Sequence, residues 1–223
     1  MAIKQHTVYV RTAISAACAA GSFLLAGCHD MQAADMTNLT AALNDYLAHR
    51  GNLCLAKYDW PIDVTSVEPQ VGDRDAVQMP VLEKLGLVTS KDTMVIRKTD
   101  DGTVMLRARE YALTAEGMKY YLHEPVIIAT ATSRITHSAD FCVAKLLLDR
   151  IIGWEPPLTR DGKTKTVVTF TYKIDPAPWT SSPDVRRVFP IIARVIEGAG
   201  TMQLREGFTL TPNGWVANEL FDD

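Results

Sequence analysis

The chain has 223 residues, of which 47% are hydrophobic and 22% charged, and its formal net charge is −3. This length suits one large domain or two small ones, and the apolar content without any low-complexity run excludes an intrinsically disordered chain. The acidic balance argues against a polyanion such as nucleic acid as the main partner.

The first 27 residues have the composition of an export signal. Lys4 and Arg11 give a positive start, and residues 12–27 carry no charge and are rich in Ala, Leu, Ile and Phe. That stretch is shorter than the roughly 20 apolar residues that a permanent membrane-spanning helix needs. We therefore predict a secretory signal peptide over residues 1–27. Its removal takes away two cations and no anion, which makes the mature chain more acidic than the full one.

The signal ends in Leu25-Ala26-Gly27-Cys28, which resembles the lipobox of bacterial lipoproteins: Leu, two small residues and then Cys. This resemblance covers residues 1–28 only. It implies a diacylglycerol on the Cys28 sulfur, cleavage before Cys28, and an acyl chain such as palmitate on the new amino group. Two or three acyl chains hold a protein stably on a membrane, whereas one chain binds only marginally. The alternative is an ordinary secretory signal that contains a Cys by chance.

The residues after Cys28 bear on the destination. In the lipoprotein family, Asp directly after the lipidated Cys retains the protein in the inner membrane. Here His29 follows Cys28, and Asp30 comes one place later. The resemblance therefore implies the outer membrane of a Gram-negative envelope, with the protein facing the periplasm and residues 28–36 acting as a lipidated tether.

Two further cysteines, Cys54 and Cys142, remain in the mature chain. An even pair in an oxidising compartment is typical of a disulfide. A bridge that closes a loop of about 90 residues would add roughly 4 to 5 kcal/mol in the chain-entropy model. The alternatives are two free buried thiols, or a catalytic thiolate with His137 near Cys142 in the sequence. We predict the disulfide.

The first half combines helix periodicity with strand and turn signals. Leu39, Leu43 and Leu47 lie on one face of a helix that Gly51 ends. Pro80 inside a later helical pattern predicts a start near that residue or a kink. Asp100-Asp101-Gly102 is a strong hairpin turn. The predicted ranges are 37–50, 73–85 and 115–122 for helices, and 52–58, 94–98 and 103–113 for strands.

The second half is richer in strand. Between residues 168 and 174, Val168, Phe170 and Tyr172 take one face and polar residues take the other, which indicates a sheet with one wet side. The predicted strands are 126–135, 141–154, 163–174, 201–210 and 215–220, and a helix is predicted over 182–197. These elements predict an α+β fold with antiparallel sheets and helices packed on them.

Short motifs recur in the same order in the two halves. Residues 53–57 (LCLAK) resemble residues 141–145 (FCVAK), and residues 79–82 (MPVL) resemble residues 189–192 (FPII). We interpret this order as a tandem duplication of one α+β module, with modules over 36–123 and 124–223. Under this alignment Cys54 and Cys142 are equivalent, so their pairing near a pseudo-twofold axis would join the modules.

Residues 76–122 also resemble the helix and wing of winged-helix DNA-binding domains, through Val81 to Val88, the hairpin, and Tyr111 to Thr114 with Gly117. Acidic residues intersperse the basic ones, and export would separate the protein from DNA. The resemblance therefore predicts shared local geometry, with a winged-helix regulator as an alternative function.

No familiar catalytic or metal-binding motif is found in the sequence. His-Glu-x-x-His, Gly-x-Ser-x-Gly and Gly-x-Gly-x-x-Gly are absent, and the histidines have no metal-ligand spacing. We predict a protein without cofactor or metal that is non-catalytic and binds a protein or a cell-wall component. An envelope hydrolase with an unidentified active site is the alternative. Pro178 and Trp179 are the predicted partner contact.

Overall fold

The computed structural model describes residues 30–99 and 102–221. The predicted signal peptide and Cys28 lie outside the described residues, and the body described below comprises residues 31–223. Helices and antiparallel strands alternate along it, which confirms the α+β class predicted from the sequence. In the part of the chain that is described, no helix combines the length and apolar character needed to cross a bilayer.

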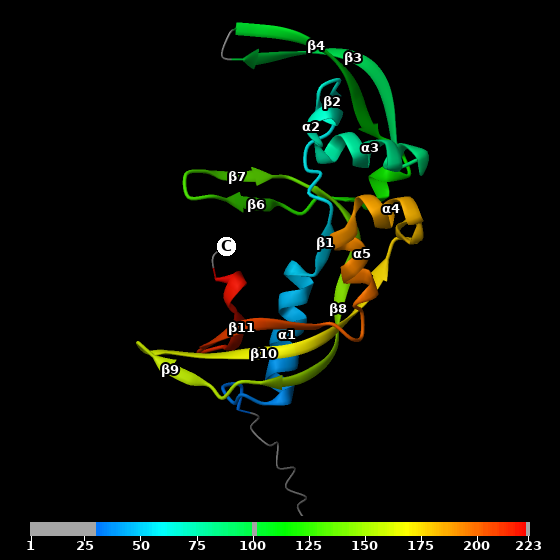
Figure 1. Ribbon diagram of the computed structural model, residues 1–223. Coiled ribbons are helices and arrows are strands. Elements are labelled where there is room, and N and C mark those ends of the chain that lie inside the picture. Colours follow the sequence, from blue (N-terminus) through cyan, green and yellow to red (C-terminus); the bar gives the residue numbers. More distant parts are fainter. Residues whose placement is uncertain (1–29, 100–101, 222–223) are drawn as a thin grey trace, which may run out of the picture. The chain divides into compact units, whose positions relative to one another are not determined.

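The larger sheet has seven antiparallel strands and contains the longest strands of the second half (Figure 1). Its main path runs β1-β8-β10-β11-β12, with β5 added to β8 and β9 added to β10. The bounds are β1 Asn52–Cys54, β5 Tyr121–Leu122, β8 Asp140–Trp154, β9 Leu158–Arg160, β10 Lys163–Pro176, β11 Gln203–Thr211 and β12 Gly214–Ala217.

Helix α1 (Met36–Arg50) covers one face of this sheet. The Asp35 side chain accepts the N–H of Asn38 at 2.8 Å and begins the helix, two residues before the predicted Thr37, and Gly51 ends it as predicted. Leucines of α1 pack against β10, β11 and β12. We call this group the α1 cluster: Leu39, Ala42, Leu43, Leu47, Val168, Phe170, Phe208, Trp215 and Ala217.

The alternation predicted for residues 168–174 is present in β10. Val168, Phe170 and Tyr172 are at most 1% exposed, while Lys173 is exposed. Thr171 on the polar face is also buried, because its hydroxyl donates to an Asp149 carboxylate oxygen at 2.9 Å. The hydrogen bond to Asp149 thus satisfies the hydroxyl that Thr171 brings into the interior.

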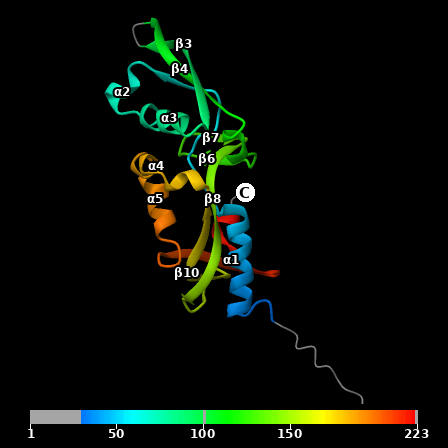
Figure 2. The same ribbon diagram turned by 90° about the vertical axis from the view of Figure 1, so that its right-hand side faces the viewer.

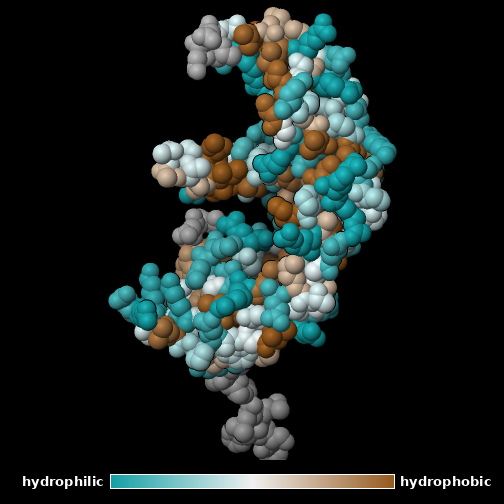
Figure 3. All heavy atoms as spheres, viewed as in Figure 1, coloured by the Kyte–Doolittle hydropathy of each residue, from teal (hydrophilic) through white to brown (hydrophobic). Residues whose placement is uncertain are grey.

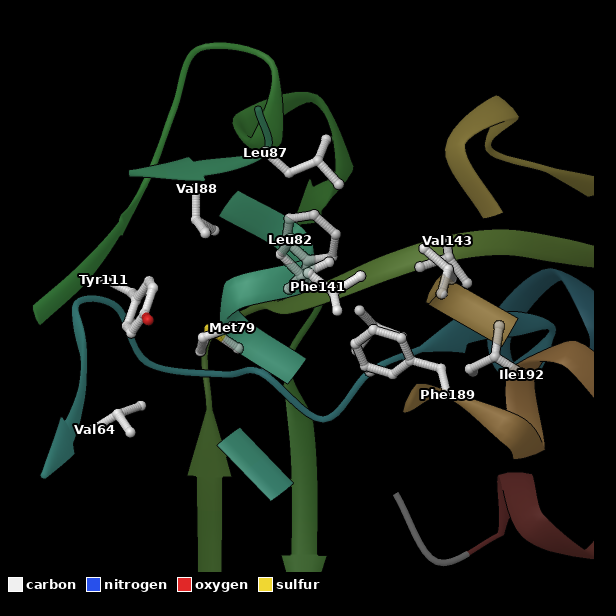
Figure 4. Close-up of a cluster of buried hydrophobic side chains, with 13 residues drawn as sticks. Val64, Met79, Leu82, Leu87, Val88, Tyr111, Phe141, Val143, Phe189 and Ile192 are labelled. Atoms are coloured by element: carbon white, nitrogen blue, oxygen red, sulfur yellow. The ribbon is translucent and has the colours of Figure 1, made fainter. Parts of the chain in front are cut away.

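A second sheet has the order β2-β4-β3, with β2 Ile62–Thr65, β3 Val88–Thr99 and β4 Gly102–Leu113. It packs with α3 (Arg74–Lys84), α4 (Pro183–Val188) and α5 (Pro190–Glu197). The short helix α2 (Glu68–Val71) follows β2, and its Glu68 carboxylate accepts the Thr65 N–H at 2.9 Å. In Figure 4, side chains of α3, of the hairpin, of β8 and of the α4–α5 segment meet around Leu82 and Phe141. This is the hairpin cluster: Leu55, Val64, Met79, Val81, Leu82, Leu87, Val88, Tyr111, Phe141, Val143, Val185, Phe189 and Ile192.

Both clusters take side chains from both predicted modules. Helix α1, from residues 36–123, packs on strands from residues 124–223, and Phe141 and Phe189 pack among residues of the first module. The division into 36–123 and 124–223 therefore stays a hypothesis about the repeated sequence motifs.

Several predicted elements end differently in the structure. Residues 126–135 form part of a hairpin, β6 (Val126–Ala129) with β7 (Arg134–His137), closed by a Ser133 N–H bond to the Thr130 hydroxyl. The helix predicted over 182–197 is broken at Phe189, because Pro190 has no N–H and disfavours a helical residue before it. In contrast, α3 continues through Pro80.

The remaining short pieces are 3₁₀ turns: Gly117–Tyr120, Pro178–Ser181 and Asn218–Leu220. The first replaces most of the helix predicted over 115–122, and the Thr114 hydroxyl accepts the Gly117 N–H at its start at 3.1 Å. The strand predicted over 52–58 ends at Cys54, since Ala56 has a φ of 57° and turns the chain out of the sheet.

Candidate functional site

The predicted lipidation site, Cys28, lies outside the described residues, so lipid anchoring stays a prediction. The other predicted site residues fall in two places. Cys54 and Cys142 lie on neighbouring strands of the large sheet, and Pro178 and Trp179 lie in a turn beside the hairpin cluster.

Cys54 in β1 and Cys142 in β8 are directly opposite each other on antiparallel strands, with their sulfurs 2.01 Å apart. This is the bonding distance of a disulfide. The pairing relates the two repeated motifs by a local twofold axis: Asn52 lies opposite Lys145, and the Lys57 N–H donates to an Asp140 carboxylate oxygen at 2.8 Å.

A cavity of about 390 Å³ opens beside the two cysteines, between the end of α1 and the start of β6. Asp140 in its wall is 5% exposed and accepts backbone N–H groups of Lys57 and Phe141. Burial raises the pKa of this carboxyl, against the effect of those N–H bonds. The buried Lys57 ammonium in turn donates to Asp75. These bonds clamp the segment after β1 onto β8.

His137, considered as a base for a Cys142 thiolate, makes other contacts. Its ring stacks on Tyr58 with 4.2 Å between centroids, and its Nδ1 lies 2.9 Å from an Asp59 carboxylate oxygen. His137 therefore contacts Tyr58 and Asp59 in the loop after β1, and Cys142 is bonded to Cys54.

Pro178 and Trp179 differ in what they offer to a partner. Pro178 is exposed, whereas the half-buried Trp179 ring lies 5.7 Å from Tyr120 and 6.0 Å from Phe141, centroid to centroid. The indole N–H of Trp179 is buried and finds no hydrogen-bond partner among residues 30–99 and 102–221. Trp179 is thus mainly a packing residue of the hairpin cluster, and only Pro178 is open to contact.

The sheet β2-β4-β3 has a surface that the sequence analysis did not single out. At its base, one face of the β3–β4 hairpin packs on α3: Val88 and Tyr111 are buried, and the Ser90 hydroxyl donates to Glu83 at 2.6 Å. Strand β2 pairs only with residues 108–111 of β4. Beyond that point the hairpin continues without a third strand.

The same face carries large apolar side chains beyond α3. Ile96 is opposite Met105, and Met94 is opposite Arg107; the three apolar side chains are 67%, 64% and 51% exposed in the order Ile96, Met105, Met94. Directly opposite residues of an antiparallel pair share a face, so these side chains extend the packed face of Tyr111. In Figure 3 hydrophobic residues gather over this hairpin. We call Met94, Ile96 and Met105 the hairpin patch.

A groove of about 290 Å³ adjoins the hairpin patch. Its helical wall is formed by Pro69 of α2 and by Ala76 and Pro80 of α3, and Arg107 and Tyr111 line it from the hairpin. Groove and patch together make an apolar strip along one face of the hairpin.

The cations of the hairpin are of two kinds. Lys91 pairs with Glu110 at 2.7 Å, and Arg109 donates to the Ser90 hydroxyl at 2.6 Å. Arg97, Lys98 and Arg107 are exposed and form no ion pair within the described residues. Lys98 and Arg107 lie on the face of the apolar strip, together with the acidic Asp92 that lines the groove beside Arg107, whereas Arg97 lies on the opposite face.

In residues 30–99 and 102–221, no three His, Cys, Asp or Glu side chains gather closely enough to hold a metal ion. The predictions about cofactors and metals are not tested by that finding. Compared with models of protein families, with curated proteins and with solved structures, the chain matches none of them.

Proposed function

We propose that this protein is a lipid-anchored lipoprotein of the bacterial outer membrane, facing the periplasm, that binds a protein partner through the hairpin patch and its adjoining groove. The observation that carries the binding role is the uncovered continuation of a packed sheet face, with Ile96 and Met105 opposite each other and both more than half exposed.

The energetics favour an apolar protein segment as the occupant. Full burial of an Ile or Met side chain is worth about 1.5 to 3 kcal/mol, so three neighbouring side chains supply much of the free energy that a specific contact needs. Contiguous exposed apolar surface marks interaction sites more often than isolated apolar residues do. A cell-wall glycan, whose surface is rich in hydroxyl groups, would bury less apolar surface against these side chains.

The charge beside the apolar strip further restricts the kind of partner that fits. Arg107 lies on the face of the apolar strip, opposite Met94, and forms no ion pair within the described region. Opposite charge at the edge of an interface speeds association and selects partners. The preferred occupant is therefore a protein segment with apolar side chains in its centre and an Asp or Glu where it meets Arg107.

The position of the hairpin within residues 31–223 suits a tethered protein. The first turn of α1, which follows the predicted tether, and the β3–β4 hairpin lie at opposite ends of this body in both ribbon views (Figures 1 and 2). A protein held at the first end presents the hairpin away from its anchor.

The neighbourhood of α3 argues against the winged-helix alternative. A DNA-reading helix must enter the major groove. Here α4 lies along α3, with Lys84 bonded to Asp184 at 2.8 Å and the Gln78 amide donating to the Val188 carbonyl at 3.1 Å. One side of α3 is therefore occupied by protein, and its C-terminal Lys84 is already neutralised.

Site-specific crosslinking tests the binding role. A photoreactive residue at position 96 in the full chain should yield a reproducible adduct with one envelope protein, and the same residue at position 147 should not. Leu147 in β8 is a matched control because it is 52% exposed on the other sheet. Met105→Asp should abolish the adduct from position 96. Equal adducts from both positions, or an adduct that survives Met105→Asp, would refute the proposal.

The anchor has a separate test. Cys28→Ser should remove acyl labelling and release the protein from the membrane fraction, because the thioether to diacylglycerol cannot form. If the variant keeps the label and the membrane attachment of the parent, the lipoprotein assignment is wrong.

A further inference from the structure

We propose that the free edge of β3 pairs antiparallel with β3 of a second copy of this protein, so that two hairpins form one six-stranded sheet and their hairpin patches become one surface. The inference deepens the proposed function, and it rests on that function only in treating the hairpin patch as the partner-binding surface.

Strand β3 has the properties of an edge that can accept another strand. It lies at the end of the order β2-β4-β3 and is 12 residues long, while the edge strands β1, β2 and β12 have three or four residues. Its ladder with β4 is continuous from Val88–Leu113 to Thr99–Gly102, without a bulge, and β3 contains no Pro. Short strands, bulges, Pro and charged side chains are common means of protecting an edge. Of these β3 has only charged side chains, Lys91, Asp92, Arg97 and Lys98, and the register below places none of them opposite a like charge.

The sequence of β3 is complementary to itself in one register. If Val95 lies opposite Val95 of the second copy, Met94 lies opposite Ile96 and Asp92 lies opposite Lys98 of that copy, and the reciprocal pairs form by symmetry. Each is a favourable cross-strand pair. In this register no two like charges are directly opposite among residues 91–99.

The neighbouring registers are worse. A shift that places Asp92 opposite Arg97 also places Lys91 opposite Lys98, and it turns the two patches to opposite faces, because side chains alternate along a strand. The register centred on Val95 keeps Met94 and Ile96 of both copies on one face. Two patches of three apolar side chains then join across the twofold axis, with Met105 of each copy at the outer ends.

Cysteine crosslinking in the membrane tests the pairing. Val95→Cys in the full chain places two thiols opposite each other across the axis, where Cβ atoms are about 4.5 to 5.5 Å apart. Mild oxidation should give a reducible dimer. Met105→Cys is the matched control, since it is exposed but lies one strand further from the axis in each copy, roughly 14 Å from its equivalent. The control should dimerise at least tenfold less.

A charge exchange makes the test specific for the register. Asp92→Lys or Lys98→Asp, each combined with Val95→Cys, should lower the crosslinked fraction several-fold, because like charges then face each other. Asp92→Lys together with Lys98→Asp should restore it. Resistance to limited proteolysis equal to that of the parent shows that each variant is folded.

Two outcomes overturn the inference: Val95→Cys that dimerises no more than Met105→Cys, and a double exchange that does not recover the single variants. Neither touches the proposed function, which fails if the photoadduct at position 96 is missing, is matched by an equal adduct from position 147, or is insensitive to Met105→Asp. A monomeric protein that still gives that adduct would refute the pairing and keep the binding role.

Discussion

Each of the two sheets has a long strand with large apolar side chains on one face, but only one of these faces is fully covered. In β10, Phe170 is 1% exposed because α1 covers its face of the sheet. In β3, Ile96 lies on the face that packs on α3 further along the strand and is 67% exposed, because α3 ends its contact with the hairpin near Ser90 and Tyr111. The lengths of the neighbouring elements thus decide whether an apolar face of a strand is buried.

The largest expected effect is in the α1 cluster. Phe208→Ala removes a fully buried ring in β11 and should lower the free energy of unfolding by about 3 to 5 kcal/mol, the usual cost of such a cavity. Chemical denaturation of the purified soluble body measures it. A loss below about 1 kcal/mol would mean that α1 does not seal this face as described.

Loss of the Cys54–Cys142 link should have the next largest effect. Replacing both residues by Ala should cost about 2 to 5 kcal/mol, since 88 positions separate them in the sequence. Hydrogen exchange should show a greater loss of protection in the hairpin cluster than in the α1 cluster, because the bonded strands hold the segment that leads to the hairpin. The parent under reducing conditions is the control, and unchanged stability in both would contradict the predicted disulfide.

A smaller, pH-dependent effect on the free energy of unfolding is expected from Asp140, where β8 begins. Burial raises the pKa of this carboxyl in the folded protein, against the N–H bonds that it accepts. The folded state then holds the proton more tightly than the unfolded state does, so the stability gained from it is complete below the usual pKa of about 4 and is lost as the pH rises through the folded-state pKa. The stability of the parent relative to Asp140→Asn should therefore fall as the pH rises above about 4. A difference that is flat with pH, or that rises, would contradict this assignment.

The smallest effect on stability should come from the hairpin patch. Ile96→Ala removes a mostly exposed side chain, and such changes usually alter the free energy of unfolding by less than about 0.5 kcal/mol. The difference between the stability losses of Ile96→Ala and Phe208→Ala is the clearest measure of the contrast between the two sheets. A loss above about 2 kcal/mol would show that something covers this face in the isolated protein.

Local signals in the sequence predicted most elements of the fold. The Asp-Asp-Gly turn placed the long hairpin, and the run of residues 163–174 gave the central strand β10 with its buried face. The predictions were wrong where the local sequence signal was weak or where tertiary packing determined the structure. The turn Thr130 to Ser133 contains no Gly, Pro or Asn, so β6 and β7 were read as one strand.

The candidate site was predicted less well. Met94, Ile96 and Met105 read as ordinary strand residues, because their exposure depends on β2 being four residues long and on where α3 ends. Trp179 was chosen as a surface residue from its Pro-rich loop, yet its ring packs beside Tyr120 and Phe141. The exposure of the hairpin patch and the burial of the Trp179 ring both depend on contacts between segments that are distant in the sequence, which local sequence patterns do not reveal.

The bond between Cys54 and Cys142 has a mechanical consequence. It places residues 55–141, and with them the whole β3–β4 hairpin, inside a covalent ring that is entered and left at neighbouring strands of the large sheet. Tension applied between the start of α1 and the C-terminal strands would cross from one sulfur to the other. The hairpin would carry none of that load, and its surface would keep its form while the rest of the chain is pulled.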